Sequence, residues 1–317
     1  MTQFQDQPRQ HFRLLRAWAR GSALGLMIVA LTAPPAIAKT FKEMFPGTEI
    51  KNEQARAIVE AMDYQQGIVA LGAGGVKLDV SPKYYVLGSA DAKRVLTEIW
   101  GNPPTSANGV IGMILPAVKM PIQETWGAII RFDDDGYVSD EEAGKIDYAE
   151  LLVSMKEGTA EASEAREKAG FGTMKLIGWA SQPYYDAATK KLHWAKELEF
   201  DGKPEHTLNY DVRALGRKGV LKINFVAEMG DLPVIRALIP DVMEMAQFEP
   251  GSRYSDYVPG ADKVAAYGIG GLIAGKVLAK VGLLAALLVF LKKGWIIAVL
   301  GIGGLLRLVG GWFRKKS

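Results

Sequence analysis

The nine residues LHWAKELEF, 192–200, indicate the class of fold more directly than any other stretch. Their apolar members, Leu192, Trp194, Leu198 and Phe200, stand two or four positions apart, as in a strand with one buried face. Short apolar runs that suit strands also occur at 67–71, 76–80, 84–87, 110–115, 128–132, 175–179, 207–213 and 220–227. Glycines within 72–75 separate the first two of these runs, which is typical of a β-hairpin. We therefore expect a sheet of mostly antiparallel strands.

Helices are expected at 52–62, 89–100, 147–169 and from Asp231 onwards, with Asp231 capping the last helix and Pro240 kinking it. Ser89 is expected to cap the second helix, and Asp147 opens the third with a pattern that resembles a capping box. The helices stand in clusters between groups of strands. The sequence therefore predicts an α+β fold, with a mostly antiparallel sheet and packed helices, and not a doubly wound sheet.

The composition excludes several classes of protein. The 317 residues include no cysteine, which rules out disulfide scaffolds, thiolate zinc sites, iron–sulfur clusters and cysteine nucleophiles. Hydrophobic residues make up 49% of the chain and charged residues 23%, a balance too apolar for a disordered protein. The length allows one or two domains.

The formal net charge of +3 hides three differently charged regions. Residues 1–38 carry four arginines and one aspartate, hence +3, whereas residues 39–262 carry 25 basic and 34 acidic residues, hence −9. Residues 263–317 carry nine basic residues and no acid, hence +9. A nucleic-acid-binding protein would carry its basic charge on the folded domain. We therefore expect no nucleic-acid partner.

The first 38 residues have the three parts of a secretory signal peptide. Four arginines, the last of them Arg20, precede the apolar run Ala23–Leu31, and the small-x-small site Ala36-Ile37-Ala38 follows. The nine residues of the apolar run are too few to cross about 30 Å of hydrocarbon. We expect cleavage after Ala38 and a periplasmic domain over residues 39–262. An uncleaved signal-anchor is the alternative.

Residues 263–317 are expected to anchor the chain in the bacterial inner membrane, so that the lipid bilayer is a partner through this region. Two apolar segments, 265–291 and 294–313, flank Lys292-Lys293, and one continuous helix would place both lysines near the bilayer centre. A helical hairpin with these lysines at the cytoplasmic turn avoids that cost. In the alternative arrangement only 294–313 spans the bilayer, and 264–291 lies on its outer surface as an amphipathic helix.

The acidic run Asp133–Glu142 resembles a calcium loop, but the resemblance is incomplete. Asp133, Asp135, Ser139 and Glu142 fall at ligand positions around Gly136, whereas Arg131 stands at the first position, where a calcium loop has an oxygen ligand. A solvated loop is the favoured interpretation, and divalent-metal binding is the alternative. The two histidines beyond the signal, His193 and His206, lack the spacing of zinc ligands. No metal residue is therefore predicted.

Motifs for nucleotides and for catalysis are also incomplete. The stretch from Gly270 follows most of a phosphate-binding loop, but Val277 replaces the serine or threonine that would hold magnesium, so no nucleotide and no cofactor is expected. The chain has no Gly-x-Ser-x-Gly nucleophile motif. Asp186, Glu197 and Glu199 could serve as acid–base carboxylates, but their spacing is that of ordinary surface charge. No catalytic or cofactor-binding residue is predicted.

Several motifs, taken together and in this order, resemble a known bacterial family. They are Ile99-Trp100-Gly101-Asn102-Pro103-Pro104, Asp135-Gly136-Tyr137-Val138-Ser139-Asp140, Lys145-Ile146-Asp147-Tyr148, Gly178-Trp179-Ala180, Tyr185-Asp186-Ala187-Ala188-Thr189, Leu192-His193-Trp194-Ala195-Lys196, His206-Thr207-Leu208-Asn209-Tyr210 and Asp262-Lys263-Val264-Ala265-Ala266-Tyr267-Gly268. Over roughly residues 60–290 the chain resembles domain-of-unknown-function family 2167, a family of predicted membrane-anchored bacterial proteins. The resemblance implies an exported domain tethered to the inner membrane of Gram-negative-type bacteria. It implies no reaction and no catalytic residues. The order strand, helix, short strand over Val220–Phe248 is also similar to PsbP-like and Mog-like sandwich domains.

These observations predict a membrane-anchored periplasmic domain that acts as a non-enzymatic binding or envelope-associated accessory protein. Another envelope protein is a further expected partner. Two alternatives remain open. One is a hydrolase of envelope material that uses carboxylates, and the other is a module that responds to a divalent metal at Asp133–Glu142.

Overall fold

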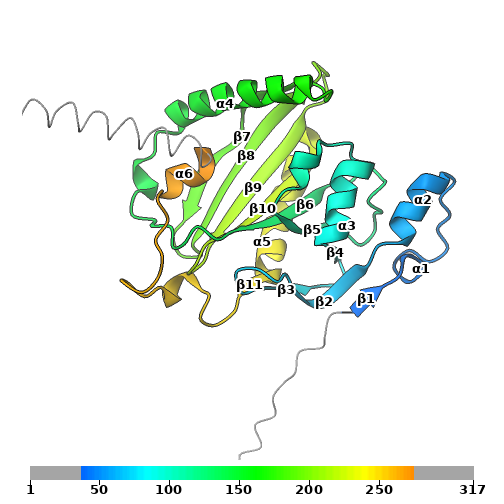
Figure 1. Cartoon of the computed structure of the whole chain (residues 1–317), viewed down its shortest axis with the longest axis horizontal. Coiled ribbons are helices and arrows are strands. Elements are labelled where there is room, and N and C mark those ends of the chain that lie inside the picture. The colour runs from blue at the N-terminus through cyan, green and yellow to red at the C-terminus, as the bar shows by residue number, and fades with distance from the viewer. Residues whose placement is uncertain (1–36, 275–317) are drawn as a thin grey trace, which may run out of the picture. The chain divides into compact units, whose positions relative to one another are not determined.

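The computed structural model describes residues 37–274, which form an α+β fold around one large sheet (Figure 1). The sheet has eleven strands in the order β11-β3-β2-β4-β5-β6-β10-β9-β8-β7, and β1 pairs with β2. Neighbouring strands are antiparallel throughout, which confirms the expected class of fold. The strands are β1 (Ile37–Lys39), β2 (Tyr64–Ala70), β3 (Val76–Val80), β4 (Tyr84–Gly88), β5 (Val110–Pro116), β6 (Gly127–Asp133), β7 (Met174–Asp186), β8 (Lys191–Phe200), β9 (Thr207–Leu215), β10 (Val220–Glu228) and β11 (Ala246–Phe248).

The helices interrupt the strands in clusters, as the sequence predicts. The α-helices are α1 (Phe41–Met44), α2 (Glu53–Glu60), α3 (Ser89–Arg94), α4 (Tyr148–Lys168), α5 (Leu232–Met245) and α6 (Ile269–Ala274). The short helical turns are the π-helix η1 (Val95–Ile99) and the 3₁₀ turns η2 (Pro104–Ala107), η3 (Ala143–Lys145), η4 (Met229–Asp231) and η5 (Tyr254–Asp256).

Helix α5 packs on one face of the central strands and builds the largest apolar core. Its residues Ile235, Ile239 and Val242 recur at helical spacing and are buried. Alternate residues of the strands meet them, because side chains on a strand alternate between its two faces. These strand residues are Ala128 and Ile130 on β6, Leu208, Tyr210 and Val212 on β9, and Leu221, Ile223 and Phe225 on β10.

Two smaller clusters cover other parts of the sheet. Helices α1, α2 and α3 pack over β4 and β5, where Phe45, Tyr64 and Tyr85 make edge-to-face ring contacts. Helices α4 and α6 pack near Leu192 and Trp194 of β8. Figure 1 shows α4 along one side of the sheet and α3 along another, with the central strands between them. That stretch of the sheet is where the cleft described below lies.

The folded part of the chain continues past Asp262. Tyr137 exchanges backbone hydrogen bonds with Lys263 and Ala265, and Ile269, Leu272 and Ile273 are buried in the cluster near α4. The first residues of the region expected to anchor the chain therefore pack on the domain. The rest of that region, 275–317, and the expected signal over 1–36 lie outside the described residues. Within 37–274, no helix has the length and apolar character needed to cross a membrane.

Several local expectations need correction. The N-cap of α3 is Gly88, because the Ser89 hydroxyl donates to the carbonyl of Val110 on the neighbouring strand. Strand β7 extends well beyond the expected 175–179, since three shifts of register against β8 let the pairing continue to Asp186. Asp231 precedes α5 but makes no capping hydrogen bond with its side chain. In contrast, Asp147 caps α4 as expected, accepting from the backbone N–H groups of Ala149 and Glu150.

Candidate functional site

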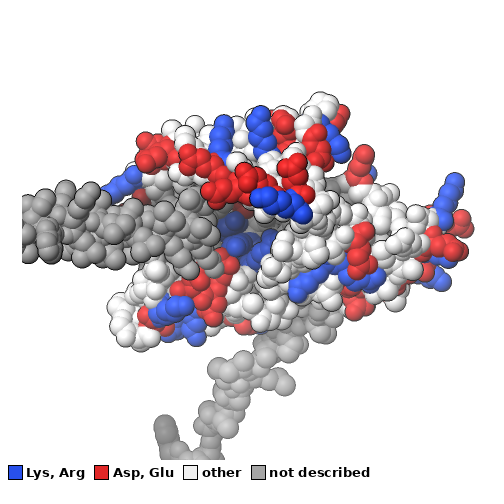
Figure 2. Space-filling view, turned by 45° about the horizontal axis from the view of Figure 1, so that its top comes forward, with Lys and Arg blue, Asp and Glu red and all other residues white. Residues whose placement is uncertain are grey.

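A polar cleft of about 910 Å³ opens over the face of the central strands that looks away from α5. Its floor is formed by alternate residues of β6, β8, β9 and β10, namely Ile129, Arg131, Leu198, Phe200, Thr207, Asn209, Asn224 and Val226. Its walls come from the end of η1, from η2, from the loop 121–125 and from the C-terminal end of α4. Figure 2 shows the hollow, with basic side chains inside it and acidic side chains along its upper rim.

Three cations form a row across this face of the sheet. In the strand register, Lys222 on β10 lies directly opposite Arg213 on β9 and also directly opposite Arg131 on β6. Residues directly opposite one another in an antiparallel pair share a face, with Cβ atoms about 5 Å apart. The register therefore places three positive side chains next to one another, although like charges in such positions are destabilising.

Asp211 provides the negative charge at one end of the row. Its side chain is 3% exposed and accepts a hydrogen bond of 2.9 Å from Arg213. Lys196 Nζ lies 3.1 Å from the other carboxylate oxygen, an ion pair whose angle falls short of a hydrogen bond. Burial by itself raises the pKa of Asp211, but the charges of Lys196 and Arg213 outweigh burial and hold that pKa below its usual value. The carboxylate is therefore ionised inside the protein.

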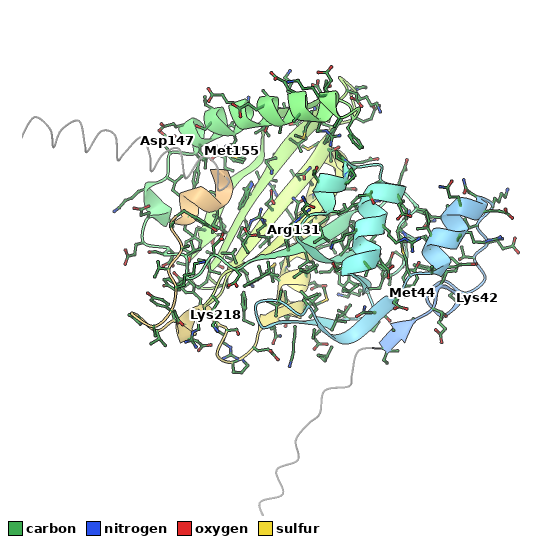
Figure 3. All side chains as sticks on the ribbon, in the orientation of Figure 1. Lys42, Met44, Arg131, Asp147, Met155 and Lys218 are labelled. Carbon is green, nitrogen blue, oxygen red and sulfur yellow. The ribbon has the colours of Figure 1, made fainter. Side chains whose placement is uncertain are left out.

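Lys222 and Arg131 form the other end of the row. Lys222 Nζ donates to Asp133 at 3.1 and 3.2 Å. The Arg131 guanidinium donates to the carbonyl oxygens of Ser106 and Asn108, and no carboxylate of residues 37–274 lies within ion-pair distance of it. Burial lowers the pKa of both groups, and the neighbouring charge of Arg213 lowers both further. Figure 3 shows Arg131 over the central strands, between α3 and α4.

The charges of this cluster do not balance. Among the described residues, Lys196, Arg213 and Lys222 pair with Asp211 or Asp133 and Arg131 pairs with neither, so four cations of this cluster stand against two carboxylates. Arg131 is the member that both lines the cleft and lacks a carboxylate among the described residues. Chemically, the floor can hold a negatively charged group beside Arg131.

The comparisons with known proteins place the chain in a family. The sequence model of the family described as "Protein of unknown function (DUF2167)" matches residues 63–303. The chain belongs to the DUF2167 family. This result confirms the resemblance seen in the sequence, and every residue that lines the cleft lies within the matched range. A comparison with curated proteins finds no match.

Among solved structures, this DUF2167 chain is similar to the solution structure of cyanobacterial PsbP (CyanoP) from Synechocystis sp. PCC 6803. The two share 11% sequence identity with a TM-score of 0.31, and the likeness covers 56% of this chain and 88% of that one. A score this low supports no conclusion about the fold or the function of the DUF2167 chain.

The acidic run Asp133–Glu142 is held by contacts within the protein. Asp133 pairs with Lys222, and the hydroxyl of Tyr267 donates to Asp135. Asp140 accepts hydrogen bonds from the hydroxyls of Tyr185 and Tyr254, at 2.6 and 3.0 Å, and from Lys190. Within residues 37–274 no group of three histidines or carboxylates is arranged to hold a metal ion. The structure therefore does not bring the calcium-like ligand positions together.

Gly136, the central glycine of this run, has a structural role of its own. Its φ angle is +102°, and a Cβ atom there would lie 2.5 Å from the carbonyl oxygen of Lys263. Such a separation is too short for any side chain, so the close approach of the segment after Asp262 requires glycine at this position. The glycine that suggested a calcium loop thus allows the C-terminal segment to pack on the domain.

The three carboxylates considered for acid–base chemistry do not meet in the cleft. Asp186 accepts from Ala188 N–H and from Thr189 in the turn between β7 and β8. Glu197 and Glu199 lie on either side of His206, at 2.5 and 3.7 Å from its ring nitrogens, on strand positions that alternate with those of the cleft floor. Sequence spacing could not show this group of three, because His206 lies just before β9 whereas the two glutamates lie on β8.

No functional role follows from the sequence for the cleft residues, and Arg131 stands out there only as a misfit in the calcium-like run. The available signal was the row of polar residues at alternate positions of two predicted strands, with Asn209, Asp211 and Arg213 in one and Lys222 and Asn224 in the other. That pattern predicts one polar face, and the polar face of an antiparallel sheet usually contacts solvent. Only the packing of η1, η2 and the loop 121–125 on one side and of α4 on the other converts this face into the floor of a cleft.

Proposed function

We propose that this chain is a non-enzymatic binding domain of the bacterial envelope, whose ligand site is the cleft over β6, β8, β9 and β10. The observation that carries the proposal is the uncompensated cationic row beside a cleft of about 910 Å³. Half-buried charges without enough counter-charges destabilise a fold, so they are retained where a ligand uses them. The cleft is also large enough for a small organic ligand or part of a larger one.

The location in this proposal rests on the sequence. Residues 1–38 have the order of parts found in a secretory signal, and cleavage after Ala38 would remove two of the three residues of β1. The domain then lies in the periplasm, and the C-terminal region tethers it to the inner membrane. Because residues up to Ile273 pack on the domain, we propose that lipid contact begins after α6. The stretch 275–291 has 17 residues, the length of a short spanning segment, and we propose that it forms a helical hairpin with 294–313.

Neither alternative function gains support from the described residues. A carboxylate-dependent hydrolase would need two acids facing each other across a cleft, whereas Asp186, Glu197 and Glu199 lie elsewhere. A divalent-metal module would need several oxygen ligands converging, whereas Asp133 and Asp140 each contact lysine or tyrosine partners. The proposal of a binding domain therefore stands on the cleft.

Cell fractionation of the full chain in a Gram-negative host tests the location. We expect the protein in the membrane fraction after carbonate washing, and we expect added protease to digest the domain in spheroplasts but not in intact cells. Removal of residues 275–317 should shift the domain to the soluble periplasmic fraction. Recovery of the full chain in the soluble cytosol, with its first 38 residues intact, would overturn the proposed location.

Reporter fusions after Ser317 distinguish the two arrangements of the anchor. With the domain outside, a hairpin returns the C-terminus to the periplasm, where alkaline phosphatase is active and a cytosolic reporter is not. A single span leaves the C-terminus in the cytoplasm and reverses both results. Phosphatase activity is the expected outcome, and activity of the cytosolic reporter alone would reject the hairpin.

A further inference from the structure

The excess of positive charge beside the cleft, in a cluster of which only Arg131 lines the cleft, points to the charge of the ligand. Lys196, Arg213, Lys222 and Arg131 carry four positive charges against the two negative charges of Asp211 and Asp133. A ligand group that carries close to two negative charges would balance the cluster. A phosphate monoester has a charge of about −1.5 to −2 at neutral pH, whereas a single carboxylate carries only −1.

Arg131 has the geometry that such a group needs. Its guanidinium is fixed from behind, because Nε and one terminal nitrogen donate to the carbonyls of Asn108 and Ser106. A guanidinium is a planar fork with five N–H donors, so donors remain after those two bonds are made. Held donors lose little conformational entropy on binding, and a guanidinium matches the oxygens of a phosphate. Asn224, two positions from Lys222 on the same face of β10, adds an amide to the floor of the cleft.

Acidic residues limit where an anion can bind in the cleft. Glu124, Glu228 and Asp231 also line it. Glu228 is six residues from Lys222 along β10, which corresponds to roughly 20 Å of strand. The negative charge of Glu228 therefore lies far from the cationic row and repels an anion from that end. Two cations of residues 37–274 line the cleft, Arg131 and Arg166 of α4, and only Arg131 also belongs to the cationic row, so we expect a phosphate at the end of the cleft near Arg131.

The apolar walls farther along the cleft, where Leu198 pairs with Thr207 and Thr207 pairs with Glu228, indicate the rest of the ligand. Leu96, Ile99 and Trp100 line one side, and Met174, Leu198 and Phe200 line another. We propose that the cleft binds a phosphate monoester through Arg131, with an apolar part of the ligand against these walls. This inference rests on the proposed binding function of the cleft. The phosphate could belong to a lipid headgroup or to a soluble phosphate ester, and the experiment below separates these sources.

Calorimetric titration of the full chain in neutral detergent tests the inference. The probes are inorganic phosphate and glycerol 3-phosphate, added at constant ionic strength, with acetate as the carboxylate control. We expect saturable binding of both phosphates and at least about tenfold weaker binding by Arg131→Gln, because a hydrogen-bonded charge pair is lost. Lys83→Gln is the matched control, since it removes a cation paired with Asp241 at a site outside the cleft. We expect its affinity to change less than twofold.

A second variant distinguishes a loss of phosphate binding from a loss of folding. Arg131 also holds the carbonyls of Ser106 and Asn108, so Arg131→Gln could disturb that loop. Arg131→Lys keeps the charge but loses the fork, and we expect a loss of affinity between those of the wild type and Arg131→Gln. The inference is overturned if the wild type binds neither phosphate probe, if it binds acetate as tightly as phosphate, or if both Arg131 variants bind phosphate as the wild type does.

Short-chain lipids identify the source of the phosphate. Dihexanoyl phosphatidic acid and glycerol 3-phosphate share the phosphate monoester, and dihexanoyl phosphatidylcholine serves as the control without a net charge. Binding of the phosphatidic acid at least tenfold more tightly than glycerol 3-phosphate assigns a lipid ligand, and equal affinities assign a soluble ester. Failure of all phosphate probes with a membrane-tethered protein rejects this inference alone. A soluble cytosolic protein that still binds phosphate rejects the proposed location alone.

Discussion

The two faces of β6, β9 and β10 have opposite chemistry, although alternate residues of the same three strands form both faces. Toward α5 the strands present Ile130, Val212 and Ile223, which are buried among apolar side chains. Toward the cleft the neighbouring positions present Arg131, Arg213 and Lys222. The first face is continuous and apolar, whereas the second holds charges that are partly removed from water. The comparison shows that the apolar core and the charged cluster lie on different faces of one sheet, and our proposal places ligand binding on the second face.

The difference has an energetic meaning. Burial of apolar surface on the α5 face stabilises the fold by about 25 cal/mol for each Å² removed from water. On the cleft face, desolvation and like charges oppose folding, as the lowered pKa values of Arg131 and Lys222 indicate. A side chain on the first face should therefore matter for stability, and its neighbour on the second face should matter for ligand binding.

The largest expected effect comes from Phe225, which is fully buried on the α5 face and contacts the ring of Trp126. Replacement of Phe225 by Ala should lower the free energy of unfolding by about 3–5 kcal/mol, through lost burial and the cavity left behind. The matched control is Asn224→Ala, one residue earlier on the cleft face, with an expected loss within about 1 kcal/mol. Urea unfolding monitored by circular dichroism measures both. Equal losses would show that the two faces contribute alike to stability.

Substitution of Asp211 tests whether the fold requires the ion pairs that this residue makes with Lys196 and Arg213. Asp211→Asn leaves Lys196 and Arg213 without their shared carboxylate. The free energy of unfolding should fall by about 3 kcal/mol, because the remaining charges are buried without a partner. The control is Asp241→Asn, which breaks the exposed pair with Lys83 and should change stability little. The same unfolding measurement compares the two variants. A loss for Asp211→Asn no larger than that of the control would contradict the requirement.

His193 tests how strongly the edge of the α5 face excludes charge. It lies opposite Val212 on that face, and burial, followed by the charge of Lys191, lowers the pKa of His193 to about 4. The unfolded chain takes up a proton near pH 6.5, whereas the folded chain does so only near pH 4. The stability contributed by His193 is therefore complete above pH 6.5 and declines as pH falls from 6.5 to 4, by up to about 3 kcal/mol.

The measurement for His193 is thermal unfolding across that range of pH. We expect His193→Phe, which keeps a ring next to Tyr184, to lose less stability than the wild type between pH 7 and pH 4.5. Above pH 7 the pH dependence of the two proteins should be parallel. Identical curves down to pH 4.5 would mean that the folded protein accommodates a charged His193 and that this edge does not exclude charge.

Features that depend on neighbouring residues in the chain were predictable from the sequence. The alternation in 192–200 corresponds to β8, and Asp147 caps α4 as expected, because a strand face and a helix cap each involve residues only a few positions apart. Ser89 shows the limit of such reasoning. Its hydroxyl was expected to cap a helix, but Val110 on another strand accepts its hydrogen bond. A hydrogen bond to a residue 21 positions away therefore takes the place of the expected helix cap.

The sequence by itself determined the period of the strands, the α+β class, the charge of each region and membership of the family. The tertiary structure alone decided which polar face became a cleft, and it placed Arg131 beside Lys222 although 91 positions separate them (222 − 131). It also packed residues 263–273 on the domain. The physical reason is that periodicity is a local property of the chain, whereas the register between distant strands follows from the burial of the whole α5 face.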